Sequence, residues 1–351
     1  MTPKPSFLDD IKDQPDLVKR LVGVYGDRLQ DRLQEAAGLI NSKSMLVIVG
    51  MGSSLFAGEL LSQRLNGAGL RAITYDASEL FHYQRGILND DDVVLLAISQ
   101  SGESAEPCLV AEARSKSMPL ICITNNKESR LGRISDTVLP LLAGHEEGTT
   151  AKTFVATMVV LHLLADAVLG ERLLSSSHAD KLARYMKELT RTLRDEVYGF
   201  IDRFGDFETL AFTGRGPGLV SAMQGALITQ EMTQIPATGL SAGQFRHGPI
   251  EAAGSHLLMV IFAPAGRTTE LLVRLAQDTA GFGSPTWLIT DTVVQVPSTE
   301  NLFVSRLPHV EEELSPLLSI LAPELLGVAL AKRKGLEPGR LQRISKVTDF
   351  E

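Results

Sequence analysis

The sequence is poor in cysteine: its 351 residues include only Cys108 and Cys122. Their spacing does not match a metal-binding motif, and both lie among apolar residues. We therefore predict that they are reduced residues of a hydrophobic core. This composition excludes a small secreted scaffold held by disulfides and favours the cytoplasm.

The sequence also lacks an excess of basic residues and a long uninterrupted apolar run. Its formal net charge is −8, whereas a nucleic-acid-binding protein would need a basic face, so no nucleic-acid partner is expected. The longest apolar run, Val155–Leu169, is interrupted by His162 and Asp166, and we expect it to be too short to span a membrane. Residues 1–10 show no signal-peptide pattern. We expect a soluble, cytoplasmic protein.

Signatures of bound metals and nucleotides are missing as well. The seven histidines are scattered, and neither H-x-x-x-H nor C-x-x-C occurs. The glycine turn G-M-G-S-S (residues 50–54) lacks the third glycine of the dinucleotide-binding pattern, and no Walker lysine follows it. We expect no metal and no cofactor.

A turn rich in hydroxyl groups is the most informative feature present. The apolar run Val93–Ile98 is typical of a buried parallel strand, and it ends in S-Q-S-G-E-S. Ser99, Gln100, Ser101 and Ser104 supply three hydroxyls and an amide, and the segment 105–116 that follows is predicted to be helical. Because a helix N-terminus attracts anions, these neutral donors favour a phosphate monoester. The alternative is an ordinary serine-rich loop that caps a helix.

Strand and helix patterns alternate along the first half of the chain. After an arm (residues 1–15) and a helical stretch (16–41), strands are predicted at 45–49, 70–75, 93–98, 120–124 and 137–142. Helices are predicted at 55–66, 77–83, 105–116 and 149–170. This alternation predicts an α/β fold, a doubly wound parallel sheet with helices on both faces. The turns after residues 49 and 98 then lie at the carboxyl edge of the sheet, where ligands bind.

The second half of the chain repeats the first about 164 residues later. The segments 210–216, 242–245 and 256–263 echo 47–52, 77–80 and 93–99, so two copies of one α/β unit are predicted. The second copy ends its strand in A-P-A-G (residues 263–266), which has no hydroxyl cluster. The predicted organisation is an arm and helix at 1–40, a phosphate-binding domain at 41–170, a helical connector at 171–205, a second domain at 206–335 and a docked tail at 336–351.

Nine motifs, taken in order, resemble those of tandem sugar isomerase (SIS) domain proteins. This family includes the isomerase half of glucosamine-6-phosphate synthase and stand-alone phosphosugar isomerases and deaminases. The matching segments are D-I-K-D-Q-P (10–15), G-M-G-S-S (50–54), S-Q-S-G-E-S (99–104), E-E-G-T-T-A-K-T-F (146–154), G-R-G-P (214–217), Q-G-A-L-I-T-Q-E (224–231), G-Q-F-R-H-G-P (243–249), P-H-V-E-E (308–312) and S-K-V-T (345–348). The resemblance implies two tandem SIS domains over nearly the whole chain.

The resemblance also implies a role for individual residues. Glu231 matches the carboxylate that moves a proton between carbons 1 and 2, and His247 matches the ring-opening histidine, which reaches in from a neighbouring subunit. Lys346 falls near the family's tail lysine, which implies a catalytic role; Ser345 is the alternative match and is expected to contact the sugar. The remaining matches are the phosphate cradle (Ser53, Ser54, Ser99, Gln100, Ser101 and Ser104) and two positions around the sugar (Glu146 and Lys152). A carboxylate and a histidine suit proton transfer and ring opening chemically.

One departure from the family bears on which of its reactions this chain is expected to carry out. The synthases carry a lysine, thought to form an imine with the sugar carbonyl, where this chain has Ile228, and isoleucine forms no imine. An isomerising deaminase needs none, since the amine of its substrate becomes the imine. The expected function is thus conversion of an amino-sugar 6-phosphate to a ketose 6-phosphate and ammonia by a homodimer.

Three alternatives remain from the sequence. A plain aldose–ketose isomerase and a fructosamine-6-phosphate deglycase would use the same ring opener, proton carrier and phosphate cradle. A non-catalytic sugar-phosphate regulator would need only the cradle, and such proteins usually carry a DNA-binding or partner-binding extension. No basic helix-turn-helix segment is recognisable here.

Overall fold

The computed structural model describes residues 6–205 and 207–346, which form two compact units. The first unit contains residues 13–183 and 343–346, and the second contains residues 6–12 and 184–342. Helices α1 (Phe7–Gly26) and α8 (Ser176–Phe204) each contribute to both units. The domain boundaries predicted from the sequence stay a prediction. Residues 1–5 of the predicted arm, residue 206 and residues 347–351 of the predicted tail lie outside the described residues.

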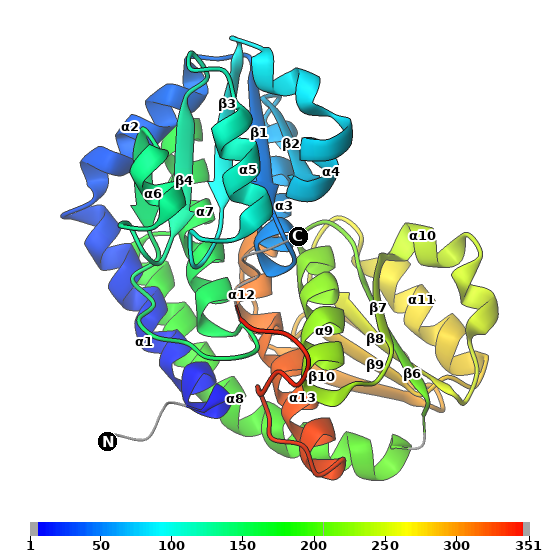
Figure 1. Ribbon diagram of the computed structural model, residues 1–351. Helices are drawn as coiled ribbons and strands as arrows, with labels where there is room; N and C mark the ends of the chain where they lie inside the picture. The colour runs from blue at the N-terminus through cyan, green and yellow to red at the C-terminus, as the bar shows by residue number, and fades with distance from the viewer. Residues whose placement is uncertain (1–5, 206, 347–351) are drawn as a thin grey trace. The chain divides into compact units, whose positions relative to one another are not determined.

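The first unit is built on a five-stranded parallel sheet in the order β2-β1-β3-β4-β5 (Figure 1). Its strands are β1 (Met45–Gly50), β2 (Arg71–Asp76), β3 (Val93–Ile98), β4 (Leu120–Thr124) and β5 (Thr137–Pro140). Its helices are α2 (Gln30–Asn41), α3 (Ser53–Gly67), α4 (Ala77–Tyr83), η1 (Arg85–Asn89), α5 (Ala105–Ala113), α6 (Arg130–Ile134) and α7 (Lys152–Leu169). Helix α3 packs on β1, β2 and α7, whereas α5 and α6 pack against each other and contact β3 and β4.

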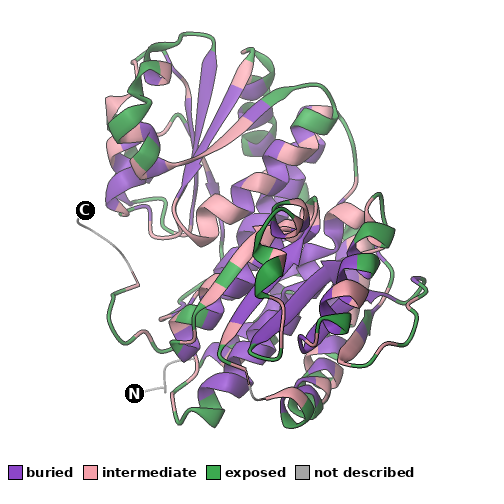
Figure 2. Ribbon diagram, turned by 90° about the vertical axis from the view of Figure 1, so that its right-hand side faces the viewer, coloured by how far each residue is buried: buried purple, intermediate pink, exposed green. Residues whose placement is uncertain are grey.

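The strands are buried because helices cover both faces of the sheet, as the apolar runs predict (Figure 2). All six residues of β3 are buried. Cys108 and Cys122 belong to the core beneath α5, and both are free thiols. Burial raises the pKa of Cys108 to about 11 and that of Cys122 to about 12, so both thiols stay protonated near neutral pH.

The second unit is built on another five-stranded parallel sheet, in the order β7-β6-β8-β9-β10. Its strands are β6 (Thr209–Gly214), β7 (Ala237–Ser241), β8 (Leu257–Ala263), β9 (Thr286–Asp291) and β10 (Leu302–Leu307). Its helices are α9 (Pro217–Thr233), α10 (Ala242–Arg246), η2 (Pro249–Ala252), α11 (Thr269–Gly281), η3 (Glu312–Leu314), α12 (Pro316–Ser319) and α13 (Leu321–Arg333). Helix α9 packs on β6, β7 and α13, and α11 packs on β8 and β9.

The two sheets confirm the predicted repeat. Their strand orders are the same once β6 to β10 are read as second copies of β1 to β5. Strands β3 and β8 begin at Val93 and Leu257, and 257 − 93 gives an offset of 164 residues. Both copies have the predicted α/β architecture of a doubly wound parallel sheet flanked by helices.

The predicted N-terminal arm is wrong for its described part, because α1 already begins at Phe7 and runs through Pro15. Ile11 before the proline and Leu17 after it are both fully buried, so the buried face of α1 continues on both sides of the proline. Burial of this face outweighs the backbone hydrogen bond that a proline inside a helix removes.

Helix α5 also ends earlier than predicted, at Ala113 instead of residue 116. Arg114 is extended, and its guanidinium donates to the carbonyl oxygens of Ala111 and Ile134 at 2.6 and 3.1 Å. These bonds stop the helix and tie its end to the last residue of α6.

Two helical segments are long and apolar enough to cross a membrane by length and composition, namely Lys152–Leu169 and Glu312–Arg333. The expectation that the first is too short was therefore wrong. In the most apolar stretch of each, 89% and 100% of the residues are buried within the protein. Their apolar character is accounted for by their position as core helices.

His162 makes α7 sensitive to acid. Its side chain is buried, and desolvation, with a smaller effect of Arg64, lowers its pKa from 6.5 to about 4. Below pH 6.5 the unfolded chain therefore binds a proton that the folded chain does not bind until about pH 4. The folded state thus loses stability as pH falls through this window.

We expect this histidine to remove about 2 kcal/mol of unfolding free energy between pH 7 and pH 5. Urea unfolding at the two pH values measures it. The variant His162→Leu should lack this part of the pH dependence and gain stability relative to wild type at pH 5. An equal pH dependence in both proteins would contradict the assignment.

Candidate functional site

Two polar turns lie at the carboxyl edge of the first sheet. Strands β1 and β3 are neighbours, and their chains continue into α3 and α5. In the order β2-β1-β3-β4-β5, this is where the strand order reverses and where ligands of open α/β sheets bind. Because α3 begins at Ser53 instead of at residue 55, Ser53 and Ser54 are its first two residues, and their backbone amides lie in the first turn of the helix.

The turn after β3 gathers its hydroxyl groups. The Oγ atoms of Ser99 and Ser104 are 3.0 Å apart, and the Gly102 amide donates to Ser99 Oγ at 3.1 Å. The Glu103 amide donates to Ser101 Oγ at 3.1 Å. Ser99 is buried, whereas Ser101 and Ser104 are partly exposed. The turn therefore presents hydroxyl groups to a ligand while its backbone is held by its own side chains.

The segment after β4 fixes this turn in place. The Asn125 amide and Thr124 Oγ1 both donate to the Gln100 carbonyl, at 2.9 and 3.3 Å. Gly102 has a φ of +68°, and a Cβ atom there would lie 1.9 Å from Ser129 Oγ. Sequence reasoning missed Thr124, Asn125 and Ser129, although the polar residues T-N-N (124–126) at the carboxyl end of β4 are a usable signal for the first two.

The donor set suits a phosphate monoester. Among the described residues, the side chains of Ser53, Ser54 and Gln100 have no hydrogen-bond partner. These groups lie at the same sheet edge as the Ser99–Ser104 turn, and two helices begin there. Hydroxyls, an amide and helix N-termini together bind an anion without a basic side chain.

Glu146 is a buried anchor for the end of the chain. Its carboxylate accepts hydrogen bonds from the backbone amides of Ala151 and Thr153, at 3.1 and 3.0 Å, directly before and within the first turn of α7. Lys346 Nζ donates to the same carboxylate at 2.7 Å and to the Gly148 carbonyl at 3.1 Å. Glu146 thus caps a helix and holds the last described residue of the tail.

The other two predicted residues of this unit differ in exposure. Lys152 is buried, with Nζ 3.6 Å from the Asp13 carboxylate. Ser345 is exposed, whereas the side chain of its neighbour Lys346 is only 17% exposed. The contact with Glu146 favours Lys346 over Ser345 as the match to the tail lysine, and the roles of all three around a sugar stay predictions.

Glu231 and His247 belong to the second unit. Glu231 lies in the last turn of α9 and is partly exposed, while Ile228, one turn earlier, is fully buried. His247 is exposed directly after α10, and its amide donates to the Gln244 carbonyl at 3.0 Å. The first unit therefore carries the predicted anion-binding turns, and the second carries the candidate acid–base groups.

Comparison with known proteins identifies the family. The SIS domain model matches the chain twice, at residues 38–167 and 206–333. The chain belongs to the SIS domain family. The two matches coincide with the two sheets and confirm the resemblance drawn from the nine motifs.

An isomerizing glutamine–fructose-6-phosphate aminotransferase of Pyrococcus horikoshii is 31% identical over 354 residues, which cover 98% of this chain and 58% of that protein. This SIS protein thus spans little more than half the length of that relative. A tagatose-6-phosphate ketose/aldose isomerase from Escherichia coli superposes with a TM-score of 0.82 at 19% identity, over 98% of both chains. A glucosamine-6-phosphate deaminase from Thermotoga maritima superposes with a TM-score of 0.75 at 21% identity, over 97% and 98% of the two chains.

The described part of this SIS protein offers no obvious metal-binding site. Within residues 6–205 and 207–346, no group of three or more His, Cys, Asp or Glu side chains is arranged to hold a metal ion. The expectation that the protein uses no metal or cofactor stays a prediction.

Proposed function

We propose that this chain is a phosphosugar isomerase of the deaminating kind. It would convert an amino-sugar 6-phosphate, such as glucosamine 6-phosphate, into a ketose 6-phosphate and ammonia. The observation that carries the proposal is Ile228, which is fully buried on α9 one turn before Glu231. Where the resemblance places an imine-forming lysine, this chain has an inert core residue, so any imine in the reaction has to come from the amine of the substrate.

The chemistry follows from the remaining groups. After His247 opens the sugar ring, Glu231 removes the proton from carbon 2 and returns it to carbon 1. The carbon–nitrogen bond at carbon 2 thereby becomes an imine, and water hydrolyses this imine to a ketone and ammonia. A partly exposed carboxylate and an exposed imidazole suit these proton transfers. The serine turns would hold the phosphate throughout.

A panel of sugar phosphates tests the function. Glucosamine 6-phosphate should yield equal amounts of ammonia and ketose 6-phosphate. Glucose 6-phosphate should give ketose at a much lower rate. Ketose from glucose 6-phosphate with no ammonia from glucosamine 6-phosphate would favour a plain isomerase instead, the activity named for the Escherichia coli neighbour. Ammonia from a fructosamine 6-phosphate alone would favour a deglycase, and tight binding without turnover of any compound would favour a regulator.

We also propose that the active form is a cytoplasmic homodimer in which His247 serves the site of the neighbouring subunit. The exposure of His247 beside a short helix supports this, because an exposed imidazole is available to a second chain. The two protonated core thiols are compatible with a reducing compartment.

Mixing two inactive variants tests the shared site. Glu231→Gln and His247→Ala should each be nearly inactive, whereas a mixture that exchanges subunits should regain about a quarter of the wild-type activity, because half of the dimers then contain one intact site. Light scattering on the same samples establishes that dimers are present. If each chain builds its site from its own Glu231 and His247, the mixture stays inactive.

A further inference from the structure

Asn125 ties together two segments of the first unit that lie far apart in the sequence. Its backbone amide donates to the Gln100 carbonyl, in the Ser99–Ser104 turn, at 2.9 Å. Its side chain accepts from the Ala143 amide at 2.9 Å and donates to the Gly144 carbonyl at 2.7 Å. Because Asn125 directly follows β4, one partly exposed residue at the carboxyl edge of the sheet holds both this turn and the segment after β5.

The backbone after β5 adopts a conformation that its surroundings have to stabilise. Leu142 has a φ of +49°, in the left-handed region that leucine rarely adopts, and its side chain is 40% exposed. Such a conformation persists only where neighbouring groups fix it. Asn125 bonds to the two residues that follow, and the Arg20 guanidinium donates to the Leu142 carbonyl at 3.3 Å. These contacts supply the constraint.

The same segment leads directly to Glu146. Gly144 has a φ of +71°, and two residues later the buried carboxylate of Glu146 caps α7 and contacts Lys346 Nζ at 2.7 Å. Glu146 is one of the residues that the resemblance to the family places around the sugar. Asn125 therefore connects the turn expected to hold the phosphate with a group expected beside the sugar.

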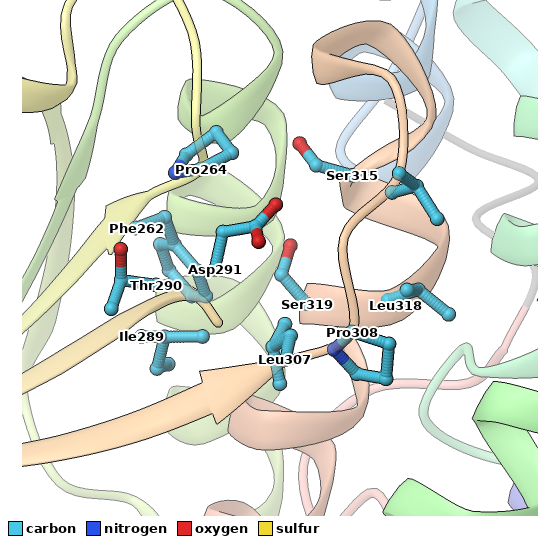
Figure 3. A pocket seen from close by; sticks show the side chains of 11 residues that line it. Phe262, Pro264, Ile289, Thr290, Asp291, Leu307, Pro308, Ser315, Leu318 and Ser319 are labelled. Atoms are coloured by element: carbon cyan, nitrogen blue, oxygen red, sulfur yellow. The ribbon is translucent and has the colours of Figure 1, made fainter. Parts of the chain in front are cut away.

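The internal repeat contains a contact of the same kind in the second unit. Strands β9 and β10 pair in the same register as β4 and β5, at a constant offset of 166 residues. Asp291 (125 + 166) is therefore the counterpart of Asn125, and His309 (143 + 166) is the counterpart of Ala143. The Asp291 carboxylate contacts His309 Nδ1 at 2.7 Å, and it shares a small space at the end of β9 with Pro308, the residue after β10 (Figure 3). Each unit thus holds the segment after its fifth strand from the end of its fourth.

We propose that Asn125 is a positioning residue that fixes the Glu146 segment (residues 142–146) against the Ser99–Ser104 turn. It thereby sets the spacing between the phosphate end and the sugar end of the substrate site, and this inference rests on the function proposed above for the turn. Without the side chain of Asn125 the turn should stay in place, because the amides of residues 125 and 131 and Thr124 Oγ1 still donate to its carbonyl groups. The Glu146 segment should be released.

Calorimetric titration of Asn125→Ala with glucose 6-phosphate and with inorganic phosphate tests the proposal. Affinity for glucose 6-phosphate, which contacts both parts, should fall about tenfold, whereas affinity for inorganic phosphate, which contacts the turn alone, should fall less than about threefold. Asn126→Ala is the matched control, because the side chain of this neighbouring asparagine accepts from the Glu128 amide within its own loop, at 3.1 Å. It should bind both ligands as the wild type does.

Amine labelling of Lys346 reads the Glu146 segment in the ligand-free protein. The Lys346 side chain is 17% exposed in its contact with Glu146, whereas that of Lys127 is 75% exposed and serves as the internal reference. Asn125→Ala should raise the relative labelling of Lys346 about threefold, because local opening exposes the amine. Asn125→Asp keeps the shape of the side chain but not its donor to the Gly144 carbonyl, and it should raise labelling as well.

Three results would overturn the proposal: equal losses of affinity for both ligands, which indicate a general structural role, unchanged affinity for glucose 6-phosphate, or unchanged labelling of Lys346. If the wild-type protein binds neither ligand, the function proposed for the turn fails, and the labelling alone then decides whether Asn125 positions the Glu146 segment.

Discussion

Replacing Glu231 with glutamine is expected to lower kcat by about 100- to 10,000-fold while substrate affinity changes little. Glutamine keeps the size of the side chain and its capacity to form hydrogen bonds, but at neutral pH it neither takes nor returns a proton. Glu231 lies at the end of α9 and is partly exposed, so the substitution should not disturb the core. Steady-state turnover of glucosamine 6-phosphate, together with equilibrium binding, measures the two effects separately.

Solvent isotope exchange makes the assignment specific. Wild-type protein in D₂O should incorporate deuterium at carbon 1 of the product, and the Glu231→Gln variant should lose incorporation in parallel with turnover. Glu270→Gln is a matched control, because Glu270 is an exposed carboxylate on another helix of the same unit. A Glu231→Gln protein with normal turnover would remove Glu231 from the chemistry, whereas a loss of affinity alone would make it a binding residue.

The sheets could be predicted because their signals are local. Runs such as Val93–Ile98 are apolar throughout and are followed by small polar residues. A single segment therefore predicts the strand, the turn after it and the sheet edge at which the turn lies. The strand order could not be predicted in this way, because it depends on which faces the crossover helices cover. The start of α1 was missed for a related reason. A proline normally breaks a helix, and only the burial of Ile11 before it and Leu17 after it shows that this helix continues through it.

The residues of the candidate site that would contact the ligand could be predicted from the sequence. The residues that hold those residues in position could not. The hydroxyls of the Ser99–Ser104 turn stand next to one another in the sequence. Thr124, which donates to this turn, and Ser129, which lies beside Gly102, are 20 or more residues away and resemble ordinary loop residues. The same holds for Glu312, whose carboxylate accepts a hydrogen bond from the amide of Arg267, 45 residues earlier in the chain. Contacts of this kind require the fold before they can be identified.

Gly102→Ala should damage both stability and phosphate binding. The φ of +68° is unfavourable for alanine, and the new methyl group would lie 1.9 Å from Ser129 Oγ and 2.6 Å from Ser129 Cβ. We expect a loss of about 3 kcal/mol of unfolding free energy from strain and overpacking together. Affinity for glucose 6-phosphate should fall more than tenfold, since the turn has to move to relieve the contact. Urea unfolding and calorimetric titration measure the two effects.

The repeat supplies the control for this experiment. Gly266 is the second unit's counterpart of Gly102, since 266 − 102 is again 164, and an added Cβ there meets the carboxylate of Glu312, the far end of a flexible side chain. Gly266→Ala should therefore cost less than about 1 kcal/mol and leave glucose 6-phosphate affinity unchanged. Adding Ser129→Gly to Gly102→Ala removes the two nearest contacting atoms and should restore part of the stability. If Gly102→Ala weakens the fold but not the affinity, the Ser99–Ser104 turn is a structural loop and the phosphate binds elsewhere.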